Sequence, residues 1–502
     1  MDRPDIDMHE AAARARSVLA SRPALIAAGF FVAAFAVRWL FAQHGFWIDE
    51  GRALLIAKNF LHGNGFRYAP DRVMWKHPFV FYTLIAVSYL FLGVKAVAGM
   101  VTTNVLAALT VATVFLTGRE LFDEWAGIAA GTLMAVLPIH MFYSTRVLTD
   151  VPGTFFVALT LYFWARTETR EEAWSFYAMF AAAGFTLLTK LTGIVVLPAL
   201  FIYYLWKERG VLFLKKRYWY GAAITAGLYG LWEVRNLLTV GFIGIVQVFL
   251  GKYLSAGGGG GAGGGGAGAL GGFVSGIGFH LTQLPNTMGL PAALLLGLGL
   301  VFAYIYRDRR MTIPLVFLAT AFVVLSQKTL NRYFLPFHPM AAVVAGYAVY
   351  RLRDIAAAKN ERAANVVFAL VLVASAAVMF QTGAAMISSS ANGFTGLEEA
   401  GKWIRQNSAE DAVVIAGSSN QIRFFSDRTT IHAGSIKSTD EFYRVLTEQN
   451  VTYVEVDRWE STQPRWYLRI VQQSDAFQPV RGFGPRKRPS VIVFRVNHEL
   501  LG

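Results

Sequence analysis

The residues of this chain that could do chemistry are polar side chains at the ends of long apolar stretches. Asp49 and Glu50, in the sequence FWIDEGRALL, come shortly after the first such stretch. A carboxylate at a membrane surface can act as the base that takes a proton from a hydroxyl group. An acidic residue that caps the N-terminus of a helix is the commoner explanation for such a pair. The pair alone leaves both interpretations open.

Trp75, Lys76, His77 and Pro78 form a second cluster, at the start of a short apolar segment. A lysine at a helix end usually extends its amine towards water along the membrane surface. A lysine held beside an aromatic residue and a proline-fixed turn can also neutralise the phosphate of a lipid. This cluster too leaves both interpretations open.

Asp150, in YSTRVLTDVPG, and Lys190, in FTLLTKLTGIVV, each lie at the turn of a tight apolar hairpin. A charged residue at the end of a membrane span can reach water, so neither residue is unusual by itself. An acid and a base on the same side of the membrane as Asp49 indicate a polar chamber. Arg146 is close enough in sequence to pair with Asp150 instead.

Lys328, Arg332 and Tyr333, in SQKTLNRYFLPFHP, form the last cluster, and Arg235 and Lys252 lie on another segment. Two or three cations beside a phenol are suited to binding a phosphate group. The alternative is the belt of aromatic and cationic residues that lies at many membrane surfaces.

The composition shows which elements must position these residues. AVILMFWYC make up 55% of the 502 residues and charged residues only 16%, whereas an ordinary soluble chain has about 25% charged residues. Disorder, a coiled coil and a conventional cytosolic enzyme are therefore excluded. The absence of Cys excludes a disulfide scaffold, an iron–sulfur cluster and a cysteine zinc site.

Several apolar stretches have the ~20 residues that cross a bilayer core, so the sequence predicts a mainly α, multi-pass transmembrane protein. The net charge of +14 does not indicate nucleic-acid binding, because the basic residues are concentrated in short loops between apolar stretches. We predict about 11 spans, at residues 24–42, 98–117, 125–144, 152–166, 175–189, 191–206, 218–236, 285–306, 311–327, 333–350 and 363–385.

Orientation follows from the basic loops at 207–217, 307–310 and 351–362. These loops fall on one side, which should be cytoplasmic, if segment 78–93 lies along the membrane surface as a juxtamembrane helix. The N-terminal segment 1–23 is then cytoplasmic and the C-terminus extracytoplasmic. All candidate residues face the outer side.

Two further segments stand apart from the spans. Residues 255–272 are a glycine-rich outer loop, which is either a linker or a mobile lid. After residue 390 the chain alternates amphipathic helices with short apolar strands, such as 412–416, 451–456 and 491–496. This pattern predicts a small soluble extracytoplasmic α/β domain at 391–502, after a transmembrane domain at 24–390.

The order of the motifs closely resembles that of a known family. "DE" soon after the first span is followed by K-H-P, then L-T-D-x-P, L-T-K-x and R-Y-x-L-P. This order resembles the GT-C glycosyltransferases that use polyprenyl-phosphate sugars, in the branch of the protein O-mannosyltransferases and lipid A aminoarabinose transferases. The resemblance covers residues 24–385, and the tail resembles the outer α/β domain of many members.

The resemblance implies a role for each candidate residue. Asp49 would be the catalytic base, with Glu50 beside it. Lys76, with Arg332 or Tyr333, would hold the phosphate of the lipid carrier. Polyprenyl phosphate is already a good leaving group. The sugar would be transferred from it with inversion at the anomeric carbon.

The remaining substrate-binding residues follow from the same resemblance. Asp150 and Lys190 would line the central cavity, and His77 would lie beside the substrate. Lys252 would stand near a family arginine in a juxtamembrane helix. The resemblance implies no obligatory metal, although Asp49, Glu50, His77 and Asp150 have the oxygen and nitrogen ligands that a divalent cation accepts.

The expected partners are a polyprenyl-phosphate-linked sugar, an extracytoplasmic acceptor and the lipid bilayer of the cell membrane. The acceptor class stays open among protein, lipid and cell-envelope glycan. A polytopic transporter or flippase of a lipid-linked or anionic substrate is the main alternative, because polar residues at broken spans also mark substrate paths. Gathering of the polar residues at one face, rather than at the midplane, favours the enzyme.

Overall fold

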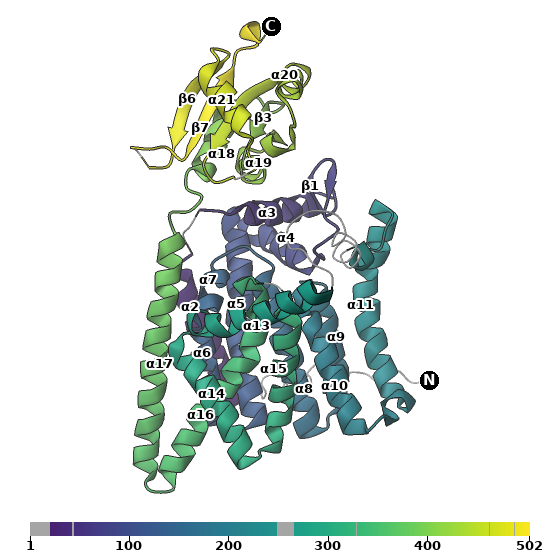
Figure 1. Cartoon of the computed structure of the whole chain (residues 1–502), viewed down its shortest axis with the longest axis vertical. Helices are drawn as coiled ribbons and strands as arrows, with labels where there is room; N and C mark the ends of the chain where they lie inside the picture. Colours follow the sequence, from purple (N-terminus) through teal and green to yellow (C-terminus); the bar gives the residue numbers. More distant parts are fainter. Residues whose placement is uncertain are drawn as a thin grey trace, which may run out of the picture.

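The computed structural model describes residues 21–42, 45–247, 266–327, 329–460, 462–485 and 487–501. A bundle of helices forms one part of the molecule, and a small sheet domain stands on one end of it (Figure 1). Lys252, Lys328, nearly all of segment 1–23 and most of the glycine-rich loop lie outside the described residues.

Each predicted span coincides with helical structure, so the multi-pass helical fold is confirmed. The helices of the bundle are α2 (Arg22–Trp39), α5 (Ala96–Leu121), α6 (Glu124–Ala135), α7 (Pro138–Ser144), α8 (Asp150–Arg170), α9 (Ala173–Leu187), α10 (Val196–Glu208), α11 (Lys216–Val240), α14 (Leu290–Tyr306), α15 (Thr312–Leu325), α16 (His338–Ala357) and α17 (Glu361–Ser390).

Within the described ranges, four helices are long and apolar enough to cross a membrane by themselves. If each of the two bent helix pairs is counted as one span, there are up to six. The predicted total of spans therefore remains a prediction.

Four predicted spans are not continuous α-helices. One of them, at 191–206, begins as the 3₁₀ helix η1 (Leu191–Val195) and becomes α10 only at Val196. Helix α13 (Gly266–Met288) meets α14 at 118°, and α6 meets α7 at 56°. The first bend falls at Gly289, whose φ of 84° favours glycine, and the second falls before Pro138, the first residue of α7. The span expected at 333–350 begins as the 3₁₀ helix η5 (Asn331–Phe337) and becomes α16 only at His338.

Close helix packing in the bundle depends on small residues. A Cβ on Gly346 of α16 would lie 2.6 Å from the backbone nitrogen of Ala130 in α6. A Cβ on Gly118 of α5 would lie 3.0 Å from the Cα of Gly127 in α6. Inside a membrane the hydrophobic effect does not drive helices together, so helix association depends on close packing. Small residues allow the backbones to approach closely. These three helices form the centre of the bundle.

Short elements cover the end of the bundle that faces the sheet domain. Helices α3 (Ile48–Leu61) and α4 (Val80–Leu92) lie across this end, as Figure 1 shows. The hairpin of β1 (Arg67–Ala69) and β2 (Arg72–Val73) connects them. Helix α4 occupies the segment that the sequence assigns to the membrane surface.

The C-terminal part is a small α/β domain, as predicted. Its sheet has the strand order β4-β3-β5-β7-β6, with β3 parallel to β4 and β5, and β7 antiparallel to β5 and β6. The strands are β3 (Val413–Ala416), β4 (Thr429–His432), β5 (Val451–Asp457), β6 (Phe477–Phe483) and β7 (Val491–Val496), and the helices are α18 (Leu397–Gln406), α19 (Ser419–Ser426), α20 (Thr439–Glu448) and α21 (Arg465–Gln473).

Helix α19 fixes this domain to α3. The amide of Gln421 donates to the backbone oxygen of Phe46 at 3.2 Å. A Cβ on Gly51 of α3 would lie 3.0 Å from the backbone nitrogen of Gln421, so glycine permits this contact. The amine of Lys58 lies 2.5 Å from a carboxylate oxygen of Asp427. The C-terminal domain therefore holds the helix that carries Asp49.

Candidate active site

Asp49 lies in the first turn of α3, between two guanidinium groups. Its carboxylate is 3.4 Å from Arg332 and 3.5 Å from Arg52, and its side chain is 47% exposed. Arg52 follows Asp49 by one helical turn, whereas Arg332 comes from η5, far away in sequence. A half-exposed carboxylate of this kind can reach both solvent and substrate.

Glu50 points away from Asp49 and is fully buried. Its carboxylate accepts hydrogen bonds from the backbone N–H groups of Trp47, at 2.9 Å, and Val147, at 2.7 Å. The guanidinium of Arg146 lies 3.6 Å away. Glu50 thus joins the start of α3 to the segment that leads into α8, and it does not line the cavity beside Asp49.

Asp150 and Lys190 form a buried ion pair. Asp150 is the first residue of α8, and Lys190 precedes the 3₁₀ helix η1 (Leu191–Val195). The Lys190 amine also lies 5.1 Å from the centroid of the Tyr333 ring. Arg146, the alternative partner of Asp150, instead contacts Glu50 and stacks on Trp47.

His77 is a neutral member of the site. Burial, followed by the nearby positive charges of Lys190 and Lys76, lowers the pKa of His77 to about 4. At neutral pH its ring can therefore both donate and accept a hydrogen bond. Lys76, the next residue, is exposed and lies outside the lining of the cavity.

A small cavity of about 60 Å³ brings these side chains together. Its lining includes Asp49, Arg52, Met74, His77, Tyr82, Thr149, Asp150, Lys190, Arg332 and Tyr333. Residues from five segments that are distant in sequence thus meet at one end of the bundle. The cavity has a carboxylate that can accept a proton and several cations that can bind an anion.

No group of three or more His, Cys, Asp or Glu side chains that could hold a metal ion occurs in the described part of the chain. The carboxylates of Asp49 and Asp150 face cations instead. The observed donor set is therefore suited to an anionic substrate.

Comparison with known proteins identifies the architecture. Residues 76–231 match the model of the dolichyl-phosphate-mannose-protein mannosyltransferase family. ArnT from Cupriavidus metallidurans bound to undecaprenyl phosphate is similar in structure over 96% of this chain and 100% of that chain, with a TM-score of 0.71 and 15% identity. The fold is that of the GT-C glycosyltransferases. The resemblance predicted from the motifs is confirmed.

A second similar GT-C structure is the archaeal oligosaccharyltransferase AglB from Archaeoglobus fulgidus, in complex with an inhibitory peptide and a dolichol-phosphate. It is similar over 95% of this chain and 76% of that chain, with a TM-score of 0.58 and 14% identity. No curated protein matches the sequence significantly. These comparisons show the GT-C fold, and the family match covers residues 76–231 only.

An apolar groove of about 500 Å³ lies between α9, α10 and α11. Leu187 and Ile194, which line one part of it, flank Lys190 in the sequence. Aromatic residues such as Phe201 and Trp219, which are largely exposed, line another part.

Arg52 and Tyr82 are cavity residues that the sequence analysis missed. Arg52 had a usable signal, because a residue three positions after Asp49 lies on the same face of a helix. Tyr82 lies within the apolar segment of α4, where nothing in the sequence distinguishes it from a buried aromatic residue. Burial raises the pKa of Tyr82, so its hydroxyl stays protonated.

Proposed function

We propose that this protein moves a sugar from a polyprenyl-phosphate carrier to an acceptor on the outer side of the cell membrane. The observation that carries the proposal is the position of Asp49, a half-exposed carboxylate between Arg52 and Arg332 at a cavity that also holds Lys190. A base for the acceptor and cations for a phosphate are the two requirements of such a transfer.

The donor phosphate would bind to the cations of the cavity. Arg332, with Tyr333 stacked against it at 5.3 Å, is placed to contact the phosphate from one side. Lys76 would contribute from the rim. Lys252, which lies outside the described residues, is a further proposed phosphate-binding residue. Support comes from the similar ArnT and AglB structures, which contain undecaprenyl phosphate and a dolichol-phosphate, respectively.

The apolar groove would hold the isoprenoid chain of the donor. Its lining residues Leu187 and Ile194 flank Lys190, so a lipid can extend from the groove with its phosphate near the cavity. A long apolar chain gains free energy by burial, at about 25 cal/mol per Å² of apolar surface removed from water.

The chemical step would be a direct displacement. Asp49 takes the proton of the acceptor hydroxyl, and the acceptor oxygen forms a bond to the anomeric carbon. The bond from this carbon to the phosphate oxygen breaks on the opposite face, so the configuration inverts and polyprenyl phosphate leaves. Arg332 and Lys190 stabilise the negative charge that develops on the phosphate.

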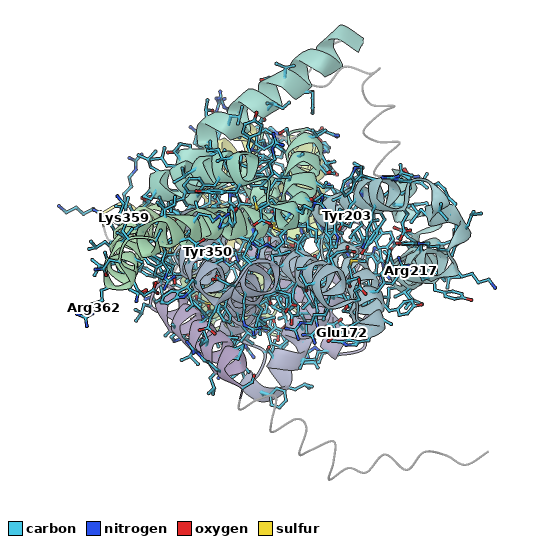
Figure 2. All side chains as sticks on the ribbon, turned by 90° about the horizontal axis from the view of Figure 1, so that it is seen from below. Glu172, Tyr203, Arg217, Tyr350, Lys359 and Arg362 are labelled. Atoms are coloured by element: carbon cyan, nitrogen blue, oxygen red, sulfur yellow. The ribbon has the colours of Figure 1, made fainter. Side chains whose placement is uncertain are left out.

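The location of the site agrees with an outer reaction. Figure 2 views the molecule from the end away from the C-terminal domain, where Lys359 and Arg362 extend outward. Cytoplasmic ends of membrane proteins are enriched in such residues. We therefore place this end and segment 1–23 in the cytoplasm, and the transmembrane domain 24–390 below an extracytoplasmic domain 391–502.

The proposal is tested with purified protein in detergent, given a panel of polyprenyl-phosphate hexoses and pentoses. Wild type should release polyprenyl phosphate from at least one donor, whereas Asp49→Asn should not. Asp71→Asn is a matched control, because Asp71 is an exposed aspartate in the same outer loop and does not line the cavity. Absence of release from every donor, with the carrier lipid bound, would favour transport.

A further inference from the structure

A second and larger cavity lies between the two parts of the molecule. It has a volume of about 720 Å³ and is formed by the end of α3, the hairpin that follows it, and the α19–β4 corner of the C-terminal domain. This volume is in the range of ~300–1,000 Å³ that is typical of small-molecule sites. We call it the interdomain cleft, and its lining includes Lys58, His62, Arg67, Glu410, Asp427 and Arg428.

The walls of the interdomain cleft are fixed by hydrogen bonds. Arg423 donates to the backbone oxygen of Tyr68 at 3.4 Å and to the hydroxyl of Thr430 at 3.0 Å. Arg428 donates to the backbone oxygens of Ser408 and Arg405, at 2.9 and 3.0 Å. The cleft is therefore a preformed site, because both domains contribute rigid walls.

Several polar groups on these walls remain available to a ligand. Arg67 is exposed and donates through one guanidinium nitrogen to the backbone oxygen of Pro70. The side chains of His62 and Asn64 are exposed, and within the described residues neither has a hydrogen-bond partner. These groups offer both hydrogen-bond donors and acceptors.

The charges on the walls select the chemistry of the ligand. Lys58, Arg67, Arg423 and Arg428 outnumber the carboxylates of Glu410 and Asp427, so the cleft favours a negatively charged ligand. Glu410, and the oxygen of Asp427 that does not contact Lys58, can accept hydrogen bonds from hydroxyl groups. A ligand with many hydroxyls and an occasional acidic group satisfies both sets of residues.

Tyr68 contacts a residue of the interdomain cleft on one side and a residue of the cavity at Asp49 on the other. Tyr68 accepts a hydrogen bond from Arg423 in the wall of the cleft. Its ring lies 5.1 Å from the guanidinium of Arg52, which lines the cavity. Lys58 and Asp49 are nine residues apart on α3, which corresponds to about 13 Å along the helix. A short oligosaccharide can cover this distance, whereas a single sugar cannot.

We infer that the interdomain cleft binds an acidic oligosaccharide, as the acceptor whose end reaches Asp49. The role as acceptor rests on the proposed function, whereas binding in the cleft does not. The C-terminal domain then has two roles, because it holds α3 in place and also forms one wall of the binding site.

The test measures binding of two defined probes to the full chain in lipid nanodiscs, by isothermal titration calorimetry without donor. Tetragalacturonic acid is the acidic probe and maltotetraose the neutral one. We expect tighter binding of the acidic probe, and about tenfold weaker binding of it to the double variant His62→Ala, Arg67→Gln, because charge-assisted hydrogen bonds are lost.

Arg72→Gln is the matched control, because Arg72 is an exposed arginine on the other strand of the same hairpin and pairs with Asp71 outside the cleft. It should leave binding unchanged. Equal binding of both probes, or unchanged binding to the double variant, would overturn the inference. Binding without release of polyprenyl phosphate from any donor would instead contradict only the proposed function.

Discussion

The centre of the bundle and its outer end are built by opposite rules. Between α5, α6 and α16 the helices approach until a Cβ on glycine would touch the neighbouring backbone. At the outer end, helices stop early and bend, and polar side chains from five segments, four of which contribute charged groups, meet in one cavity. The difference teaches that the bundle provides rigidity by steric fit, whereas the outer end keeps polar groups accessible for chemistry.

The largest effect on the bundle is expected from a larger side chain at a position where two helices are in contact. We expect Gly346→Leu to prevent folding, at a cost of at least about 3 kcal/mol, because its Cβ alone would lie 2.6 Å from a backbone atom of α6. The measurement is the yield of monodisperse protein in detergent. Gly297→Leu is the control, because nothing lies within 4 Å of that position, and equal yields would contradict the packing.

At the outer end, a substitution of Glu50 tests whether the active site depends on the rigid attachment of α3 to Val147. Glu50→Gln should lower turnover and cost about 1–3 kcal/mol of stability, because the amide group places a donor against a backbone N–H that needs an acceptor. Thermal unfolding and donor turnover are the measurements. Glu448→Gln on the exposed face of α20 should change neither, and a normal melting temperature for Glu50→Gln would refute the positioning role.

The contrast between Asp49 and Glu50 also shows what could not be predicted from the sequence. Both are acidic residues at the start of one helix, and the sequence predicts a shared role. Only the packing of α3 against Val147 determines which carboxylate is buried. Length and apolarity suffice to predict the helices, because the membrane imposes both.

Breaks and irregular strands were harder to predict. The bend at Gly289 depends on a backbone conformation that a glycine permits but does not require. Strand β6 contains Pro479 and Gly482 and exposes several side chains, so its sequence lacks the apolar pattern of a strand. Arg332 reaches Asp49 only through the tertiary fold, so the sequence predicted its phosphate-binding role but not its contact with Asp49.

His77 gives a smaller effect, on the pH dependence of stability. Its pKa is lowered to about 4 in the folded protein, so the unfolded chain binds the proton more tightly. Stability should therefore decrease as the pH falls from about 6.5 to about 4, by at most ~3 kcal/mol from this group. His77→Gln should remove this part of the slope in thermal unfolding between these pH values, and an unchanged slope would contradict the burial of the ring.

The smallest effect is expected from removal of metal ions. The carboxylates of the cavity are already paired with cations, so we predict full turnover after exhaustive treatment with EDTA. Loss of turnover that Mg²⁺ or Mn²⁺ restores would show that the site needs a divalent ion.

The central claim is that Asp49 acts on the acceptor and is not needed to hold the donor. The most direct measurement compares turnover and polyprenyl-phosphate binding for wild type and Asp49→Asn. We predict that the variant loses turnover by about 10²–10⁴-fold, the usual contribution of a general base, while its dissociation constant for polyprenyl phosphate changes little. Normal turnover by Asp49→Asn, or equal loss of binding and turnover, would contradict the account.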